Sequence, residues 1–294
     1  MQVTSVFKLY KIYFGYDGLS IDPLRGLQFS GTAFNMFMYI TNFVLLCLFT
    51  PAVAIPAERA IACQSRTARG LQGRATVISD GTSFRSGTLT TGLVGLKWQA
   101  TGALYQGGCS AGLQNINTCY EMTLSSDPNA QLEPDAGSPR QRVEFLNSRV
   151  DNGTYRYTWR SYFNAYNTGG TRFFHTMQIF SATYGGPVYF TNLLVQGFQF
   201  QDAVTNEVLA SIPVSDILCR PLQHTIDITY GQNGRINYVI TDSTTGTIVM
   251  SYRSGQRSVG TGANYLKFGL YRGTWSGMPS LKAWYGDYTG RQVA

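Results

Sequence analysis

The feature that most constrains the fold is a repeated alternation of aromatic or β-branched residues with polar residues in short runs. Residues 155–160 read Tyr-Arg-Tyr-Thr-Trp-Arg, which places aromatic side chains on one face of an extended strand and polar ones on the other. Residues 237–240 and 247–252 are similar runs with a Thr-Thr-Gly turn between them, and they predict a β-hairpin. Gly, Asn and Asp separate such runs along most of the chain. The pattern predicts an all-β fold, a jelly-roll β-sandwich of two antiparallel sheets.

The N-terminal region has a different character. An apolar run at 37–49 is followed by Thr-Pro-Ala-Val-Ala, an A-x-A-like cleavage site that ends at Ala54. The run is shorter than the ~20 residues that a membrane-spanning helix needs. A secretory signal therefore fits better than its rival, a signal-anchored membrane form. The expected division is a gene-model extension at 1–35, a signal peptide at 36–54 and a single jelly-roll domain at 55–294.

Cleavage after Ala54 would remove Cys47 and leave an even set of cysteines, Cys63, Cys109, Cys119 and Cys219. In a secreted chain such a set implies disulfides, although four cysteines allow three pairings. Cys109 with Cys119 is the local candidate, which would leave Cys63 for Cys219. A zinc site is the alternative, but the chain has no C-x-x-C pair. The sequon at Asn152 lies in an Asp-Asn-Gly turn and predicts a glycosylated surface hairpin.

The charge of the chain indicates the kind of partner. The chain has 23 basic and 16 acidic residues, and removal of 1–54 leaves 20 and 14, a net charge of +6. All but three of those basic residues are arginine, whose planar fork suits bidentate binding of carboxylate, sulfate or phosphate. For a secreted, extracellular protein this favours an acidic polysaccharide over nucleic acid. We expect a monomer with no stable membrane association after signal removal.

Several reaction classes find little support. Only two histidines exist, His175 and His224, which leaves little room for a histidine-rich metal site or a Ser-His-Asp triad. The E-x-D-x-x-E strand of sandwich glucanases is also absent, so the paired carboxylates of retaining hydrolysis are hard to find.

The strongest local signal is the run at 265–272, Tyr-Leu-Lys-Phe-Gly-Leu-Tyr-Arg. Its period-two alternation places Leu266, Phe268 and Leu270 on one face, which suits a core. The other face carries Tyr265, Lys267 and Tyr271, which suits a ligand, although a plain amphipathic strand would alternate in the same way.

Two further runs carry polar residues in strand-like surroundings. In 142–146, Arg142 and Glu144 share a face, so the carboxylate could hold the guanidinium, or the two could form a surface ion pair. The run at 173–180 is apolar but contains His175 and Gln178, and buried polar groups need partners. Because these two are three residues apart, a regular strand would point them to opposite faces. Either a bulge intervenes or one of the two is structural.

The three runs together resemble the signature of the concanavalin A-like jelly-roll polysaccharide lyases, the alginate and glucuronan lyases: R-x-E, then a Gln-bearing strand, then Y-x-K-x-G-x-Y. The resemblance spans roughly 140–287. It implies that Arg142 and Gln178 neutralise the substrate carboxylate and that Tyr271 transfers a proton. The departures concern the base, because Phe180 stands where alginate lyases carry the His of Gln-x-His, and Leu146 replaces a second arginine.

The resemblance leads to a specific hypothesis, a lyase that cleaves a uronate-containing glycan by β-elimination. His175 or Tyr271 would be the base, and substrate-binding residues would be Glu144, Tyr265, Lys267 and Arg272. Independently of the family, removal of a proton beside a carboxylate requires cationic or hydrogen-bonding groups, which an arginine-rich site supplies. The hypothesis needs no cofactor and no metal at the active site; Asp287 and other scattered acids could contribute to a structural calcium site. The alternatives are a non-catalytic glycan-binding protein of the same fold and a structural cell-wall protein.

Overall fold

The computed structural model describes residues 9–15, 18–24, 75–110, 112–134, 136–164, 170 and 172–293. The chain divides into two compact units, Met1–Ala52 and Val53–Ala294. In the first unit the described residues form an antiparallel pair, β1 (Leu9–Gly15) and β2 (Gly18–Leu24). The signal peptide predicted at 36–54 lies outside the described residues. Within the described part of the chain, no helix is long and apolar enough to cross a membrane.

In the second unit, the described residues form two antiparallel sheets of eight strands each, which we name after strands β17 and β18. The β17 sheet has the order β13 (Val208–Ile212), β12 (Gly197–Asp202), β11 (Gly186–Leu194), β10 (Phe174–Ser181), β17 (Asn264–Gly273), β8 (Arg140–Leu146), β5 (Lys97–Ala100) and β4 (Arg85–Thr88). The β18 sheet has the order β16 (Ile248–Arg253), β15 (Arg235–Asp242), β14 (Leu222–Tyr230), β9 (Gly153–Phe163), β18 (Leu281–Gln292), β7 (Cys119–Leu124), β6 (Ala103–Gln106) and β3 (Thr76–Asp80). Two 3₁₀ turns complete the described elements, η1 (Ala182–Tyr184) and η2 (Val214–Asp216).

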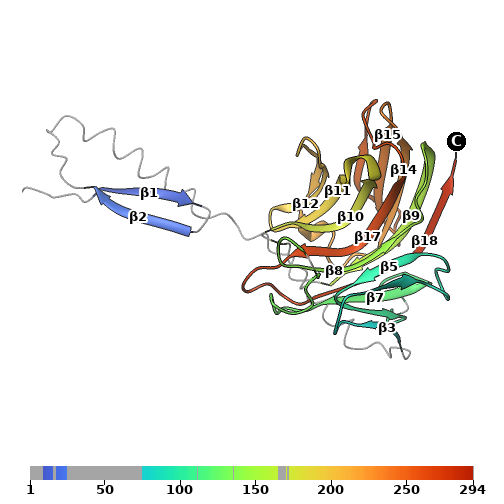
Figure 1. Ribbon diagram of the computed structural model, residues 1–294, viewed down its shortest axis with the longest axis horizontal. Coiled ribbons are helices and arrows are strands. Elements are labelled where there is room, and N and C mark those ends of the chain that lie inside the picture. The colour runs from blue at the N-terminus through green and yellow to red at the C-terminus, as the bar shows by residue number, and fades with distance from the viewer. Residues whose placement is uncertain are drawn as a thin grey trace, which may run out of the picture. The chain divides into compact units, whose positions relative to one another are not determined.

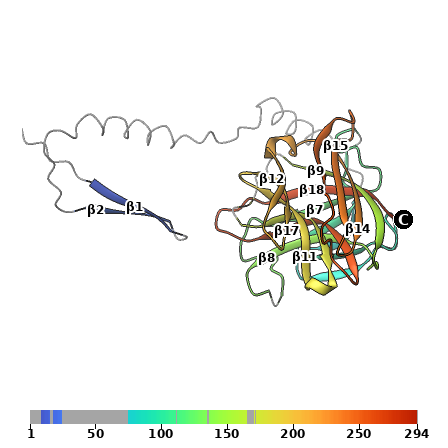
Figure 2. The same cartoon turned by 90° about the horizontal axis from the view of Figure 1, so that it is seen from above.

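The chain changes sheets repeatedly. Strand β8 lies in the β17 sheet while β7 and β9 lie in the other, and β17 is followed by β18 across the sandwich. Figure 1 shows β10, β17 and β8 side by side, and Figure 2 shows β14 beside β15 in the turned view. The fold is thus a jelly-roll β-sandwich, as the alternating runs predict. The predicted hairpin is also present, as antiparallel β15 and β16.

The core between the sheets follows from the period-two alternation. Leu266, Phe268 and Leu270 are fully buried, as the run at 265–272 predicts. The Phe268 ring lies 5.4 Å from that of Trp159 on the opposite sheet and 5.6 Å from that of Phe145 on the neighbouring strand. Burial of a side chain of this size contributes roughly 1.5–3 kcal/mol. The core therefore fixes β17 as the central strand of its sheet and leaves its other face for polar side chains.

The predicted local disulfide is present. Cys109 and Cys119 are bonded, with their Cα atoms 6.0 Å apart. Cys219 is also disulfide-bonded, and Cys63, its expected partner, lies outside the described residues.

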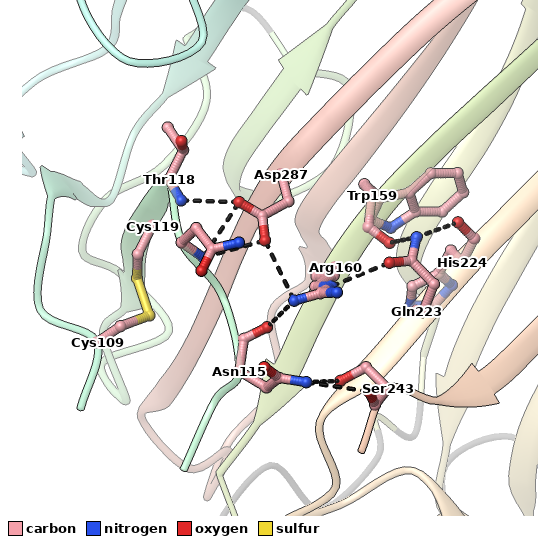
Figure 3. A network of polar contacts seen from close by, with 11 residues as sticks. Cys109, Asn115, Thr118, Cys119, Trp159, Arg160, Gln223, His224, Ser243 and Asp287 are labelled. Atoms are coloured by element: carbon pink, nitrogen blue, oxygen red, sulfur yellow. Dashed lines mark hydrogen bonds and ion pairs between the residues drawn. A yellow bond between two sulfur atoms is a disulfide. The ribbon is translucent and has the colours of Figure 1, made fainter. Parts of the chain in front are cut away.

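A polar network beside the Cys109–Cys119 disulfide is shown in Figure 3. The Arg160 guanidinium donates hydrogen bonds to the main-chain carbonyl of Asn115 (2.6 Å) and to Gln223 Oε1 (3.0 Å), and lies 3.5 Å from the Asp287 carboxylate. That carboxylate accepts hydrogen bonds from the backbone N–H groups of Asn117 and Thr118. We call this set the Arg160 network. It fastens the loop before β7 to strands β9, β14 and β18.

The Arg160 network bears on the structural calcium suggested for Asp287. Its carboxylate is engaged by two amides and a guanidinium, as described above. Among the described residues, no group of three or more His, Cys, Asp and Glu lies close enough together to hold a metal ion.

Candidate functional site

Arg142 and Tyr271 form the centre of a polar cluster on the outer face of the β17 sheet. The two are register partners on the adjacent strands β8 and β17. Arg142 Cζ lies 4.2 Å from the Tyr271 ring centroid, close enough for a cation–π contact. Arg140, two residues earlier on β8, donates a hydrogen bond from Nη1 to Tyr271 Oη at 2.8 Å. One tyrosine therefore meets two guanidinium groups, and Arg142 and Tyr271 lie on the same face of the β17 sheet.

The Arg142 guanidinium is held by side chains on three sides. It donates to Gln99 Oε1 (2.8 Å) and to Glu133 (3.1 Å), and its Nε lies 3.3 Å from Glu144 Oε2. Arg142 is 8% exposed and Glu144 only 1%. Burial disfavours the charge, but the carboxylates of Glu144 and Glu133 outweigh it and raise the pKa of Arg142 above its usual value. Gln178 on β10 donates from Nε2 to Glu144 Oε1, which joins the third strand to the cluster.

A β-bulge brings His175 and Gln178 to the same face. The register of β10 shifts between His175 and Met177 against both of its neighbours. As a result His175 lies opposite Tyr271 and Gln178 lies opposite Lys267, although the two are three residues apart. Of the two interpretations left open by the sequence, the bulge is the one found.

His175 lies among aromatic rings. Its ring centroid is 4.3 Å from that of Phe190, 5.0 Å from that of Phe173 and 5.9 Å from that of Tyr271. Its Nδ1 is 2.7 Å from Asn192 Oδ1. Burial, helped by the positive charge of Arg140, lowers the pKa of His175 to about 4, although the bond to Asn192 opposes this. The imidazole is therefore uncharged at neutral pH and able to accept a proton.

Lys267 and Tyr265 extend the cluster along β17. The ammonium group of Lys267 lies 4.5 Å from the centroid of the Phe180 ring, which is stacked at 5.0 Å on Tyr265. Burial lowers the pKa of Lys267, with the Glu144 carboxylate acting against the shift. Burial likewise raises the pKa of Tyr265.

Arg272 does not join the cluster, contrary to its expected place among the substrate-binding residues. It is fully buried on the opposite face, and its guanidinium donates to Gln141 Oε1 and to the main-chain carbonyls of Pro279 and Ser125. Burial lowers its pKa to about 10. The alternation of β17 explains this, because a residue next to Tyr271 must point the other way. Arg272 fastens the loop before β8 to β17.

Gly269 occupies the position between Lys267 and Tyr271 on the polar face. Its φ is +144°, and a Cβ atom there would overlap the backbone of Val143 and Glu144 on β8. Its carbonyl accepts a hydrogen bond from Tyr285 Oη of the other sheet at 2.8 Å. The glycine thus permits the close approach of β17 to β8 that places Tyr271 against Arg142.

Sequence reasoning missed four contributors, Gln99, Glu133, Arg140 and Asn192. Arg140 had a signal, because it lies two residues before Arg142 and so shares its face. Glu133 lies in the loop before β8, and Gln99 and Asn192 lie on strands β5 and β11. Their contacts depend on which strands become neighbours, and no local pattern reports that.

The arrangement suits an anionic ligand and proton transfer. The cations of Arg140, Arg142 and Lys267 face the carboxylates of Glu133 and Glu144, which leaves one net positive charge because His175 is neutral. A phenol hydroxyl and an uncharged imidazole lie beside this charge. These are groups that can bind a carboxylate and move a proton next to it.

The chain matches no protein-family model and no curated protein. Similar solved structures include an alginate lyase, AlgAT5, of polysaccharide lyase family 7, with 12% identity over 63% of this chain and 84% of that one and a TM-score of 0.42. They also include an endo-β-1,4-glucuronan lyase from the fungus Trichoderma reesei, with 11% identity over 62% and 85% and a TM-score of 0.43. A third is the cellulose induced protein Cip1, with 11% identity over 73% and 94% and a TM-score of 0.45. The activities named are those of the other proteins; for this chain, the similarity is one of strand arrangement.

Proposed function

We propose that this chain is a secreted polysaccharide lyase that cleaves a uronate-containing glycan by β-elimination. The observation that carries the proposal is the joint position of Arg142, His175 and Tyr271 on one face of three adjacent strands. These three residues supply a cation for the substrate carboxylate, an uncharged imidazole and a phenol hydroxyl within one site. The partner would be an acidic polysaccharide, and no step needs a metal or cofactor.

Each of these groups has a separate role in the proposed reaction. Arg142 and the second N–H of the Gln178 amide bind the uronate carboxylate and offset the charge that builds up when the C5 proton leaves. His175 takes that proton. The C4–O bond then breaks, a C4–C5 double bond forms, and Tyr271 donates a proton to the departing oxygen. Tyr271 as both base and acid is the variant of this scheme in which His175 has a structural role.

Arg140 gives Tyr271 a defined orientation for this role. Its hydrogen bond to Oη fixes the phenol, and negative charge that develops on the oxygen during proton transfer would face the guanidinium. A hydrogen bond in which one partner is charged is roughly twice as strong as a neutral one.

One observation favours the second candidate, a non-catalytic glycan-binding protein. The Arg142 guanidinium already donates to Gln99 and Glu133 and is ion-paired with Glu144, so its charge is largely balanced before any ligand arrives. A binding protein would need only affinity for the glycan. The two candidates differ in one outcome, because elimination leaves a conjugated double bond on each new non-reducing end.

The test is the ultraviolet absorbance of that double bond. The 55–294 chain is incubated with glucuronan, alginate and other polyuronates beside Tyr271→Phe, which loses only the hydroxyl. We expect the variant to bind the glycan while turnover falls by about 10²–10⁴-fold, the contribution of a general acid–base group. Tyr184→Phe, at an exposed tyrosine outside the cluster, is the matched control and should keep full turnover. Binding by the wild type without absorbance on any polyuronate would favour the glycan-binding protein, and full turnover in Tyr271→Phe would refute the role of Tyr271.

A further inference from the structure

A chain of side-chain hydrogen bonds leads from His175 across three strands. His175 Nδ1 lies 2.7 Å from Asn192 Oδ1 on β11, and Asn192 Nδ2 donates to Gln201 Oε1 on β12 at 2.7 Å. Gln201 Nε2 donates in turn to Gln199 Oε1 at 3.0 Å. Asn192 is 5% exposed, so its amide depends on these partners.

The direction of this chain is fixed by a main-chain group. The backbone N–H of Phe174 lies 3.3 Å from Asn192 Oδ1, and a backbone N–H can only donate. The atom facing Phe174 is therefore the amide oxygen, and the amide nitrogen faces Gln201. Because the same oxygen meets His175 Nδ1, that nitrogen must carry the proton.

A neutral imidazole carries a single N–H, so Nε2 of His175 keeps its lone pair. No described residue forms a hydrogen bond with Nε2. The titratable and charged groups that face the ring are Arg140 on β8 and Tyr271 on β17, and the other rings beside it are those of Phe173 and Phe190.

The chain's other histidine has no such constraint. His224 Nε2 lies 2.7 Å from Ser161 Oγ and its Nδ1 lies 2.8 Å from Tyr238 Oη. Hydroxyl groups both donate and accept, so either tautomer satisfies both partners. The fixed tautomer is therefore a property of the His175 site and not of buried histidines in this fold.

We propose that Asn192 and Gln201 are positioning residues that hold His175 in its Nδ1-protonated tautomer and leave Nε2 as the nitrogen that takes the substrate proton. The proton on Nδ1 follows from the hydrogen-bond geometry, and the lone pair on Nε2 follows because the ring is uncharged. The use of this tautomer in catalysis rests on the proposed function. In histidine bases generally, a hydrogen-bond acceptor at one ring nitrogen fixes the tautomer and leaves the other nitrogen to take a proton.

The tautomer can be measured without activity, because the chain has only two histidines. Long-range ¹H–¹⁵N correlation spectra of the ¹⁵N-labelled chain at pH 7 distinguish a protonated ring nitrogen from one with a lone pair. His175→Gln assigns the signals. We expect His175 to carry its proton on Nδ1, and a proton on Nε2 would overturn the proposal.

Two substitutions of Asn192 test what holds the tautomer. Asn192→Leu removes the acceptor and should give a mixture of tautomers, and Gln201→Leu should act in the same direction but less, because Phe174 still orients Asn192. Asn192→Asp keeps the acceptor and adds charge, so the tautomer should persist and His175 should titrate at a higher pH. Asn237→Leu, at an exposed asparagine of the β18 sheet, is the matched control. If His175 keeps its tautomer in Asn192→Leu, the proposal is contradicted. If Asn192→Leu does not fold, the proposal is contradicted when His175 titrates in Asn192→Asp at the same pH as in the wild type, or at a lower one.

Kinetics test the catalytic use of the tautomer. On a polyuronate that the wild type cleaves, Asn192→Leu should lower kcat by roughly 10–100-fold, the scale found when the hydrogen-bond partner of a metal-binding histidine is removed, with KM nearly unchanged. Asn192→Asp should restore kcat and move the acidic limb of the pH–rate profile to higher pH, since the base must be unprotonated. An unchanged kcat in Asn192→Leu would refute the catalytic part. A wild type inactive on every polyuronate would count against the proposed function, while the spectra would still decide the tautomer.

Discussion

Arg142 and Arg160 lie on opposite sheets of one sandwich and are bound in contrasting ways. The Arg160 guanidinium reaches a main-chain carbonyl at Asn115, and its partner Asp287 binds two main-chain amides. The Arg142 guanidinium is hydrogen-bonded and ion-paired to side chains. The Arg160 side chain is 25% exposed and that of Arg142 is 10% exposed.

The difference indicates what each arginine is for. Main-chain groups at a loop must find partners, and the Arg160 network supplies them, so it serves the fold. The strands around Arg142 already have their main-chain partners in the β-ladders with β17 and β5. A buried charge that no main-chain group requires costs desolvation without serving the backbone, which is typical of a functional site.

The largest effect is expected when Arg142 is replaced, and the difference between the two arginines is tested by replacing it alone and together with its partner Glu144. Arg142→Met leaves the Glu144 carboxylate buried without its cation, and we expect a loss of about 3–5 kcal/mol in the free energy of unfolding. Arg142→Met/Glu144→Gln removes both charges and should return to within about 1 kcal/mol of wild type. Denaturant unfolding measures both. A double variant as unstable as the single one would mean that the fold needs Arg142 as much as it needs Arg160.

A smaller effect is expected on the other sheet. Asp287→Ala leaves two amides and the Arg160 guanidinium without their carboxylate, which should cost about 1–3 kcal/mol. Turnover on a polyuronate should not change, because Asp287 lies outside the cluster on the β17 sheet. Asp151→Ala, at an exposed aspartate, is the control for loss of a negative charge. A fall in turnover at unchanged stability would show that the two regions are coupled.

A third expected effect develops gradually, as a pH dependence of the free energy of unfolding to which both histidines contribute. The pKa is lowered by burial to about 4 at His175 and to about 3 at His224, below the ordinary value of 6.5. Because the folded pKa values are the lower ones, the unfolded chain binds more protons, and stability should fall as the pH drops below 6.5. The slope is at most about 1.4 kcal/mol per pH unit for each histidine, and for His175 it should end near pH 4.

Denaturant unfolding at several pH values between 7.5 and 4.5 measures this slope. His175→Phe should remove about half of it, and the remainder should belong to His224. A slope that the substitution leaves unchanged would mean that His175 titrates as it does in the unfolded chain.

The sequence predicted the fold and the face of the site for one physical reason, the period of the strand. Alternation alone placed Phe268 inside and Tyr271 outside, and it would also have placed Arg272 inside had it been applied one residue further. The family resemblance linked the three runs in one hypothesis, and in the structure β10, β17 and β8 are neighbours in one sheet.

The rest depended on contacts between distant segments. The bulge at His175 arises from the register with β11 and β17, which a single strand does not encode. Glu133 reaches Arg142 from a loop, and Asn192 reaches His175 from a neighbouring strand. Such partners have no fixed spacing in the sequence, so no local pattern predicted the groups that hold Arg142 and His175.

Gly269 limits how this site can diversify. Because any side chain at that position would push β17 away from β8, a substitution there cannot reshape the centre of the cluster without also separating Arg142 from Tyr271. On the proposed function, a change in glycan preference would have to leave Gly269 in place and act through other positions, such as those on β11, β12 and the loop before β8. Mutational libraries should keep Gly269 constant and place their diversity there.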